Sequence, residues 1–270
     1  MKRKLLEQLI EWKESKKRLP LLLEGARQVG KTYLLKTLFG EKYFEKVIHV
    51  NFEKADSELI NLFEGNIQPQ RIIDYLALKF NTPISQDNTL IIFDEIQEVP
   101  RALTSLKYFA EDAPKYYVVA IGSLLGIALH SGTSFPVGKV NRLRLYPMDF
   151  EEFCWANNME EQTEEAHNAI ESLKRPLITS GFKDLFQQYL AIGGMPAAVS
   201  TWIESKNIDI VEMILKNILS DYKDDFSKHT TNTESRRIAN LWQSVPRQFA
   251  KENHKFVYKT IEPSARGRDY

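Results

Sequence analysis

The segment at residues 25–32 has the residue types and spacing of a phosphate-binding loop. It reads Gly-Ala-Arg-Gln-Val-Gly-Lys-Thr and fits the pattern G-x-x-x-x-G-K-[ST]. The glycines of such a loop let the backbone close around phosphate groups, and its amide N–H groups and the following helix N-terminus bind the negative charge. We therefore predict that a nucleotide contacts Gly25, Ala26, Arg27, Gln28, Val29, Gly30, Lys31, Thr32 and Tyr33.

Two side chains of this loop have separate expected roles. Lys31 is expected to reach the β- and γ-phosphate oxygens, and Thr32 to ligate Mg²⁺ through its hydroxyl group. ATP and Mg²⁺ are the expected cofactors. The alternative is an ordinary glycine turn, but an apolar run at 19–23 precedes the loop and helical spacing at 31–38 follows it. That context favours the phosphate-binding interpretation.

An acidic pair, Asp94-Glu95, follows the apolar run Leu90-Ile-Ile-Phe. Such a run predicts a buried strand, and ligands of open α/β sheets bind at the carboxyl ends of the strands. We predict that Asp94 holds Mg²⁺ and that Glu95 orients and deprotonates the attacking water. The alternative is a strand that simply ends in exposed acids.

A third, weaker signal is Gly122-Ser123 at the end of another apolar run. A polar residue there could sense the γ-phosphate, so Ser123 joins Glu95 and Lys31 among the predicted catalytic residues. The alternative is a Gly-Ser turn without a role in chemistry.

A parallel sheet is needed to bring these motifs to one edge. Short apolar runs alternate with helical spacing over the first part of the chain, which predicts an α/β fold with a five-stranded parallel sheet and helices on both faces. The nucleotide-binding core is placed at residues 1–147. The predicted strands are 19–23, 47–52, 89–93, 116–121 and 140–145.

Helical spacing dominates after Pro147, which predicts an all-α region over residues 148–227. A separate segment is expected over residues 228–270. It contains nine Lys or Arg and four Asp or Glu residues. This excess of positive charge is either a solvated basic face or a DNA contact, and both readings stay open.

The composition narrows the class of protein. The 270 residues contain 36 basic and 36 acidic side chains, and this neutral balance argues against a general nucleic-acid coat protein. Residues 1–12 read as an amphipathic helix and not as a signal peptide, and no run approaches the ~20 apolar residues of a membrane span. Cys154 is the only cysteine, which fits a reducing compartment. We expect a cytoplasmic protein without a membrane contact.

These motifs resemble the AAA-type (AAA+) P-loop ATPases of bacteria and archaea that carry a C-terminal domain of unknown function. The loop sequence with Arg27-Gln28, the run Phe93-Asp-Glu-Ile-Gln97 and the pair Gly122-Ser123 carry the resemblance. It extends through the segments 138–140, 145–153 and 189–196, the last of which contains Gly-Gly-Met-Pro.

The resemblance implies an AAA+ core, a helical lid and the start of a winged-helix domain. A domain similar to restriction endonucleases usually follows in this family, so we expect the chain to be truncated within the winged helix. Lys139 stands where members often have arginine, and lysine does not reproduce a planar guanidinium. A site shared by two subunits of a homo-oligomer would need an arginine in trans, for which the candidates are Arg101, Arg142 and Arg144.

Three functions remain under consideration. The first is an ATP-hydrolysing molecular switch or motor, with water activated by Glu95. The second is a nucleotide-gated DNA-binding module in which hydrolysis is slow or absent. The third is a small-molecule phosphotransferase. It is disfavoured because the acidic pair suits transfer of the phosphoryl group to water and because the sequence shows no evident acceptor site.

Overall fold

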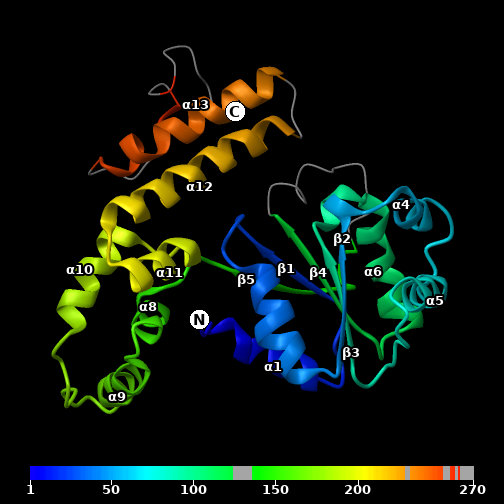
Figure 1. Cartoon of the computed structure of the whole chain (residues 1–270), viewed down its shortest axis with the longest axis horizontal. Coiled ribbons are helices and arrows are strands. Elements are labelled where there is room, and N and C mark those ends of the chain that lie inside the picture. Colours follow the sequence, from blue (N-terminus) through cyan, green and yellow to red (C-terminus); the bar gives the residue numbers. More distant parts are fainter. Residues whose placement is uncertain (124–135, 229–231, 252–255, 259–260, 262–270) are drawn as a thin grey trace. The chain divides into compact units, whose positions relative to one another are not determined.

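A computed structural model provides the structure of the chain (Figure 1). It describes residues 1–123, 136–228, 232–251, 256–258 and 261. These residues divide into two compact units, Met1–Glu212 and Met213–Tyr270. Within the described ranges, no helix reaches the length and hydrophobicity that a membrane span requires.

A five-stranded parallel sheet forms the centre of the first unit, as predicted. Its strand order is β2-β3-β4-β1-β5. All six residues of β3 are buried, because helices cover both faces of the sheet at this internal strand. The strands are β1 (Leu21–Gly25), β2 (Lys46–Asn51), β3 (Thr89–Asp94), β4 (Tyr117–Ser123) and β5 (Asn141–Leu145).

Helices cover the two faces of the sheet separately (Figure 1). One face packs against α4 (Ser57–Glu64), α5 (Pro69–Lys79) and α6 (Pro100–Asp112). The other packs against α1 (Leu5–Glu14) and the helix after the glycine-rich loop. Alternate strand residues enter the two cores, so Leu22 faces the first and Leu23 the second.

The helix after the loop differs from the predicted regular helix over 31–38. It consists of α2 (Lys31–Tyr33), a π-helical stretch (Leu34–Gly40) and α3 (Glu41–Tyr43). A π-helix hydrogen-bonds residues five apart, and Leu34 and Phe39, which have this spacing, are both fully buried. Two short 3₁₀ turns follow β2 and β3, at Phe52–Lys54 and Ile96–Glu98.

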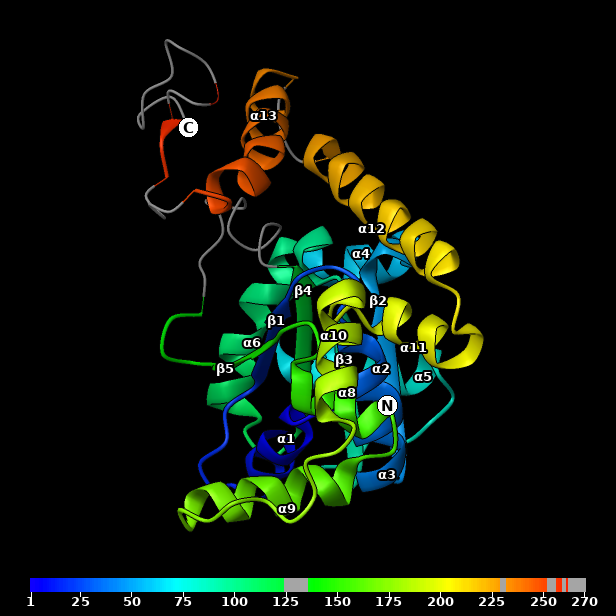
Figure 2. The same cartoon turned by 90° about the vertical axis from the view of Figure 1, so that its left-hand side faces the viewer.

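The remainder of the first unit is helical. Asp149 caps the first of these helices, since its side chain accepts from Glu152 N at 2.9 Å and the Glu152 carboxylate accepts from Asp149 N at 3.3 Å. Both cartoon views show α8, α10 and α11 side by side (Figures 1 and 2). The helices are α8 (Phe150–Ala156), α9 (Glu160–Glu171), α10 (Phe182–Ile192) and α11 (Pro196–Ser205).

The second unit contains the rest of the described chain. Helix α12 (Ile208–Lys228) begins in the first unit and ends in the second, and α13 (Asn232–Phe249) follows. The predicted helical character after residue 147 is thus confirmed, whereas the boundaries at 147 and 227 stay predictions. Much of 228–270 lies outside the described residues, and the winged helix also stays a prediction.

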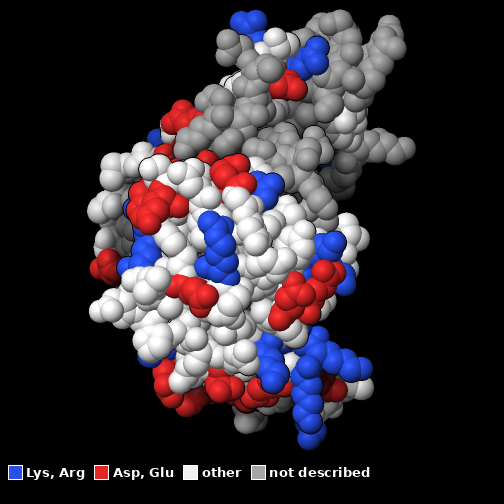
Figure 3. Space-filling view, turned by 90° about the vertical axis from the view of Figure 1, so that its right-hand side faces the viewer, with Lys and Arg blue, Asp and Glu red and all other residues white. Residues whose placement is uncertain are grey.

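The surface over α4, α5 and α6 has mixed charge. Figure 3 shows basic and acidic side chains interspersed across this face. Charges of both signs thus occur on this face, which does not favour a broad contact with nucleic acid on this side.

Candidate functional site

The glycine-rich loop joins the end of β1 to the start of α2. A Cβ atom on Gly25 would lie 2.4 Å from the Leu145 carbonyl oxygen, so only glycine fits where β1 meets the end of β5. Gly30 has φ +92°, a left-handed conformation that glycine adopts without strain. Gln28 also has a positive φ, +62°. These features give the loop the tight backbone path that phosphate binding requires.

Lys31 lies at the centre of this loop. Its ammonium group donates to Gly25 O at 3.0 Å and to Ala26 O at 2.7 Å, and the residue is only 8% exposed. Burial lowers the pKa of Lys31, and the nearby carboxylates of Glu95 and Asp94 oppose that change. Both carboxylates are therefore close enough to Lys31 to act on its charge.

Asp94 connects the loop to the end of β3. Its Oδ2 atom accepts a hydrogen bond from Thr32 Oγ1 at 2.9 Å and lies 3.0 Å from His49 Nε2. Its Oδ1 atom accepts from Glu95 N at 3.0 Å. A hydroxyl and a carboxylate oxygen at this separation are donors that suit Mg²⁺. The described residues contain no cluster of three His, Cys, Asp or Glu for a metal, so the remaining ligands would be water and phosphate oxygens.

Glu95 has an unusual backbone conformation. Its φ of +52° and ψ of +48° lie in the left-handed region, which is costly for a residue with a side chain and often marks a functional site. Its carboxylate accepts from Gln97 Nε2 at 2.6 Å. Gln97 is 2% exposed, and its Oε1 atom accepts no hydrogen bond from the described residues. The turn after β3 thus holds the Glu95 carboxylate through the Gln97 amide.

The positions of three other predicted residues give less information about their roles. Val29 is fully buried among the residues that pack on α1, so its contribution to a ligand would come from its backbone. Tyr33 is about half exposed on α2. Ser123 ends β4 and pairs with Gly25 in the parallel register, but its side chain lies outside the described part. Its sensor role stays a prediction.

Three residues that the sequence analysis did not identify also contact the motifs. His49 approaches Asp94, Gln97 holds Glu95, and Arg3 donates to the Val29 carbonyl oxygen at 2.8 Å. Gln97 ends the run Phe93–Gln97 that contributed to the family resemblance, and this position was the one signal in the sequence that could have identified it. A single histidine in an apolar strand and an arginine near the N-terminus carry no comparable signal.

The candidate trans-acting arginines have partners within the chain. Arg101 donates to Phe63 O at 2.6 Å and to Gly65 O at 2.8 Å. Arg142 and Arg144 both pair with the buried carboxylate of Glu24. These contacts account for each of the three side chains inside one chain. Lys139, the departure from the family pattern, pairs with Glu111 at 3.0 Å.

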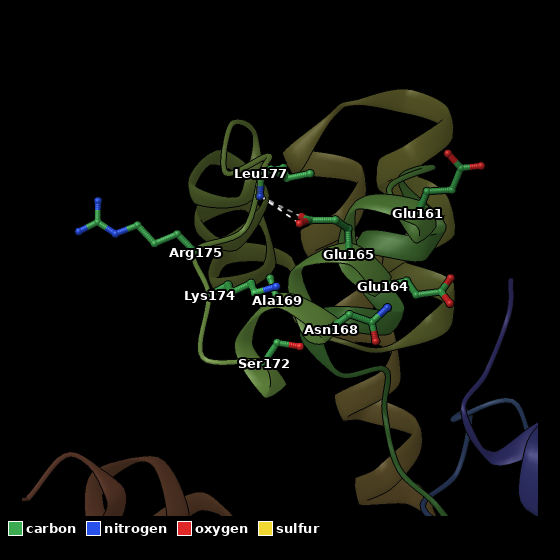
Figure 4. Close-up of a pocket in the computed structure, with 9 residues that line it drawn as sticks. All are labelled: Glu161, Glu164, Glu165, Asn168, Ala169, Ser172, Lys174, Arg175 and Leu177. Carbon is green, nitrogen blue, oxygen red and sulfur yellow. Dashed lines mark hydrogen bonds between the residues drawn. The ribbon is translucent and has the colours of Figure 1, made fainter.

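A surface hollow lies away from these motifs, between α9 and the segment that follows it (Figure 4). The Leu177 amide donates to both carboxylate oxygens of Glu165, at 3.0 and 3.2 Å. Arg175 points away from the other side chains drawn. Because the lining includes none of the predicted site residues, the hollow is separate from the candidate site. It is lined by Glu161, Glu164, Glu165, Asn168, Ala169, Ser172, Lys174, Arg175 and Leu177.

Two family models and a curated relative match parts of the chain. A family model described as an AAA domain matches residues 17–154, and one described as a domain of unknown function (DUF8612) matches residues 183–270. The uncharacterized protein MJ1544 of Methanocaldococcus jannaschii is 26% identical over 212 residues, which cover 77% of this chain and 42% of that protein. The chain therefore spans less than half the length of this curated relative.

Solved structures with distant similarity include three proteins. The Drosophila ORC bound to DNA matches with a TM-score of 0.41 at 16% identity, over 93% of this chain and 68% of its own. The C. elegans PCH-2 matches with a TM-score of 0.40 at 14% identity, over 80% of this chain and 65% of its own. The third is PH0952 of Pyrococcus horikoshii, a signal transduction ATPase with numerous domains and a tetratricopeptide repeat sensor. It matches with a TM-score of 0.41 at 14% identity, over 90% of this chain and 32% of its own.

Proposed function

Because this chain belongs to the AAA domain family of P-loop ATPases, we propose that it binds MgATP at the loop between β1 and α2 and hydrolyses it to ADP and phosphate. The hydrogen bond of 2.9 Å between Thr32 Oγ1 and Asp94 Oδ2 carries this proposal. It joins the two expected Mg²⁺ ligands, which are 62 positions apart in the sequence. Such a pair of oxygen donors beside a phosphate-binding loop is the arrangement that P-loop ATPases use.

Each residue has a defined role in the proposed reaction. The loop amides and Lys31 bind the phosphates, and Thr32 and Asp94 hold Mg²⁺, which neutralises phosphate charge when bound. Glu95 takes a proton from the attacking water while the water oxygen bonds to the γ-phosphorus atom and the bond to the β–γ bridging oxygen breaks. Ser123 is the proposed sensor of the γ-phosphate.

Nucleotide binding is tested first by thermal unfolding with MgATP, MgADP and MgGTP. At about 100 times the dissociation constant, a ligand stabilises the native state by ~2.7 kcal/mol. For a chain of this size the midpoint should rise by roughly 5 to 10 °C. Adenine nucleotides should produce this rise in the native chain and in Lys36→Ala, which changes an exposed lysine of the same helix. The rise should vanish in Lys31→Ala, and a chain without any rise would contradict the proposal.

Hydrolysis is tested by phosphate release in the absence of an added acceptor. Replacing a general base lowers turnover by about 10²- to 10⁴-fold, so Glu95→Gln should retain the thermal shift with MgATP and lose most turnover. The matched control is Glu58→Gln, on the exposed surface of α4. Full turnover in Glu95→Gln would remove the base assignment. Turnover only after addition of a small-molecule acceptor would instead support the phosphotransferase alternative.

We propose a switch or motor role for the chain, with a cytoplasmic location and assembly into a homo-oligomer. The family match and the Thr32–Asp94 contact support the ATPase chemistry alone, and the wider role rests on analogy with the family.

DNA binding through residues 228–270 is a second candidate, favoured by the nine basic and four acidic residues of that segment. Contacts to phosphates release counterions and make affinity fall steeply with salt. A duplex titration at about 50 and 200 mM salt should therefore show binding mainly at the lower concentration. Arg236→Gln/Arg237→Gln on α13 should weaken it, whereas Lys36→Gln on the first unit should not. Absence of binding at low salt would exclude this function for the chain.

A further inference from the structure

Arg3 makes contacts with three separate segments of the first unit. Its guanidinium group is buried, with the residue 5% exposed. It donates from Nη1 to Val29 O at 2.8 Å, from Nη2 to Tyr146 O at 2.5 Å and from Nε to Glu152 Oε1 at 3.2 Å. These acceptors belong to the phosphate loop, to the connection after β5 and to α8. One side chain therefore joins the loop directly to the helical region.

The acceptor on α8 is held firmly. The Glu152 carboxylate accepts from Lys4 N at 2.7 Å and from Asp149 N at 3.3 Å, in addition to Arg3. The Glu152 side chain is itself buried, and a buried charge is stable only when it is paired and hydrogen-bonded. A movement of α8 would therefore change the contact with Arg3.

A second segment of the helical region also approaches the loop. A Cβ atom on Gly30 would lie 3.8 Å from Arg3 Nη1 and 3.8 Å from Pro196 Cγ, so both residues lie beside the same point of the loop. Pro196 begins α11 and follows the Gly-Gly-Met turn. The Gly194 carbonyl accepts from Met148 N at 2.7 Å, which fixes this turn to the connection after β5.

The chemistry of the peptide group links this contact to a ligand on the loop. The Val29 carbonyl and the Gly30 amide belong to one planar peptide unit, so they rotate together. A phosphate that accepts from the Gly30 amide orients this unit and with it the carbonyl that Arg3 contacts. The planar guanidinium holds its donors at fixed angles, so a rotation at Val29 is transmitted to Glu152.

We propose that Arg3 is a positioning residue that couples phosphate binding at the loop to the placement of helices α8 and α11. The ligand-dependent part of this inference rests on the proposed nucleotide binding. The coupling itself requires only that the loop and the helical region each respond to a change at Arg3.

Hydrogen–deuterium exchange of the full chain, with and without MgADP, tests this inference. In the native chain, MgADP should slow exchange at residues 25–32 and also at 148–156 and 189–200. Arg3→Met/Glu152→Gln removes both charges, so neither is left buried alone, and keeps an oxygen acceptor for the α8 cap. This variant should retain the MgADP-dependent protection at 25–32. It should lose at least half of the MgADP-dependent protection at 148–156 and 189–200. Arg3→Lys keeps the charge without the fork and should give an intermediate loss.

Lys4→Met is the matched control. The Lys4 side chain forms exposed ion pairs with Asp149 and Glu151 of the same region, and neither pair involves the loop. This variant should leave the helical protection as in the native chain. Native-like helical protection in Arg3→Met/Glu152→Gln would overturn the coupling.

The ligand-free measurement separates the two proposals. A native chain without MgADP protection at 25–32 would contradict the proposed function. The coupling is then decided by exchange without nucleotide, where Arg3→Lys should accelerate exchange at both 25–32 and 148–156. An unchanged rate at either segment would overturn it.

Discussion

At the scale of single residues, the candidate site depends on a few side chains whose partners are far away in the sequence. Asp94 contacts Thr32 from the loop and His49 from β2, while Gln97 holds Glu95 from within the same turn. The role of the acidic pair was predictable because it follows a buried strand in a chain that also contains a phosphate-binding loop. The orientation of Glu95 was not, since it depends on a left-handed backbone and one buried amide.

Gln97→Leu should lower turnover by about 10- to 100-fold, the usual effect of removing a partner that orients a functional side chain. The substitution removes the amide that donates to Glu95 and does not touch the phosphate loop, so the thermal shift with MgADP should be unchanged. Steady-state phosphate release, with exposed Gln86→Leu as the control, measures the effect. A rate equal to that of the native chain would mean that Gln97 does not position Glu95, and a higher rate would mean that it restrains Glu95.

Cys154 should be unreactive in the folded chain. Burial raises the pKa of its thiol from 9.0 to about 11, and Glu151 and Asp149 add to this effect. The folded state then favours the neutral thiol, so the resulting stability is complete below pH 9 and is lost as the pH rises towards 11. Alkylation at pH 8 should be at least ~100-fold slower in the native chain than in denaturant, because the thiolate is about 100-fold scarcer and is buried. Equal rates would contradict this expectation.

At the scale of elements, two glycine-containing turns determine how the site and the helical region meet. The loop before α2 needs Gly25 and Gly30 for its close approach to β5 and its left-handed turn. The turn before α11 needs Gly194, where a Cβ atom would lie 1.9 Å from the Met148 carbonyl oxygen. The Gly-Gly-Met-Pro segment contributed to the family resemblance in the sequence, but its contact with residue 148 could not be predicted there.

Gly194→Ala should destabilise the chain by about 3 kcal/mol, at the upper end for overpacking, because the nearest obstacle is backbone rather than a flexible side chain. The thermal midpoint should fall by roughly 6 to 12 °C for a chain of this size. Gly65→Ala is the matched control, since its nearest neighbours are the ends of the Arg71 side chain at 3.7 and 3.8 Å. Differential scanning calorimetry measures both, and equal midpoints would show that the turn relaxes without cost.

At the scale of the whole molecule, two family models match different parts of the chain. The AAA domain match ends at residue 154, within α8, and the match to the domain of unknown function begins at residue 183. The candidate arginines Arg101, Arg142 and Arg144 all bond within the chain. These contacts assign none of the three to a second copy, so the trans-acting arginine that our proposed homo-oligomer requires has to be tested directly.

Phosphate release per chain should consequently rise with protein concentration, from about 0.1 to 10 μM, because assembly follows mass action. Light scattering over the same range should show a parallel rise in mass. The Glu95→Gln variant provides the background at each concentration. A constant rate per chain at a constant monomeric mass would mean that the site is complete within one copy, and the trans-acting arginine would be excluded.

The sequence by itself determined the fold class, the five strands, the helical character of the C-terminal part and the two main motifs. Each of these follows from local information: the alternation of strand and helix periodicities, and residue types that need only their neighbours in the chain to have meaning. The family resemblance rested on the same short segments, and the AAA domain match confirmed it.

Only the tertiary structure determined the strand order, the π-helical stretch after the loop and the partners of the site. Arg3 lies 26 residues from Val29 and 149 from Glu152, and His49 lies 45 from Asp94. The periodicity of a sequence carries no information about which polar groups meet across such separations. Those pairs form because strand packing brings distant segments together, and a buried polar group is then stable only with the partner that the fold places beside it.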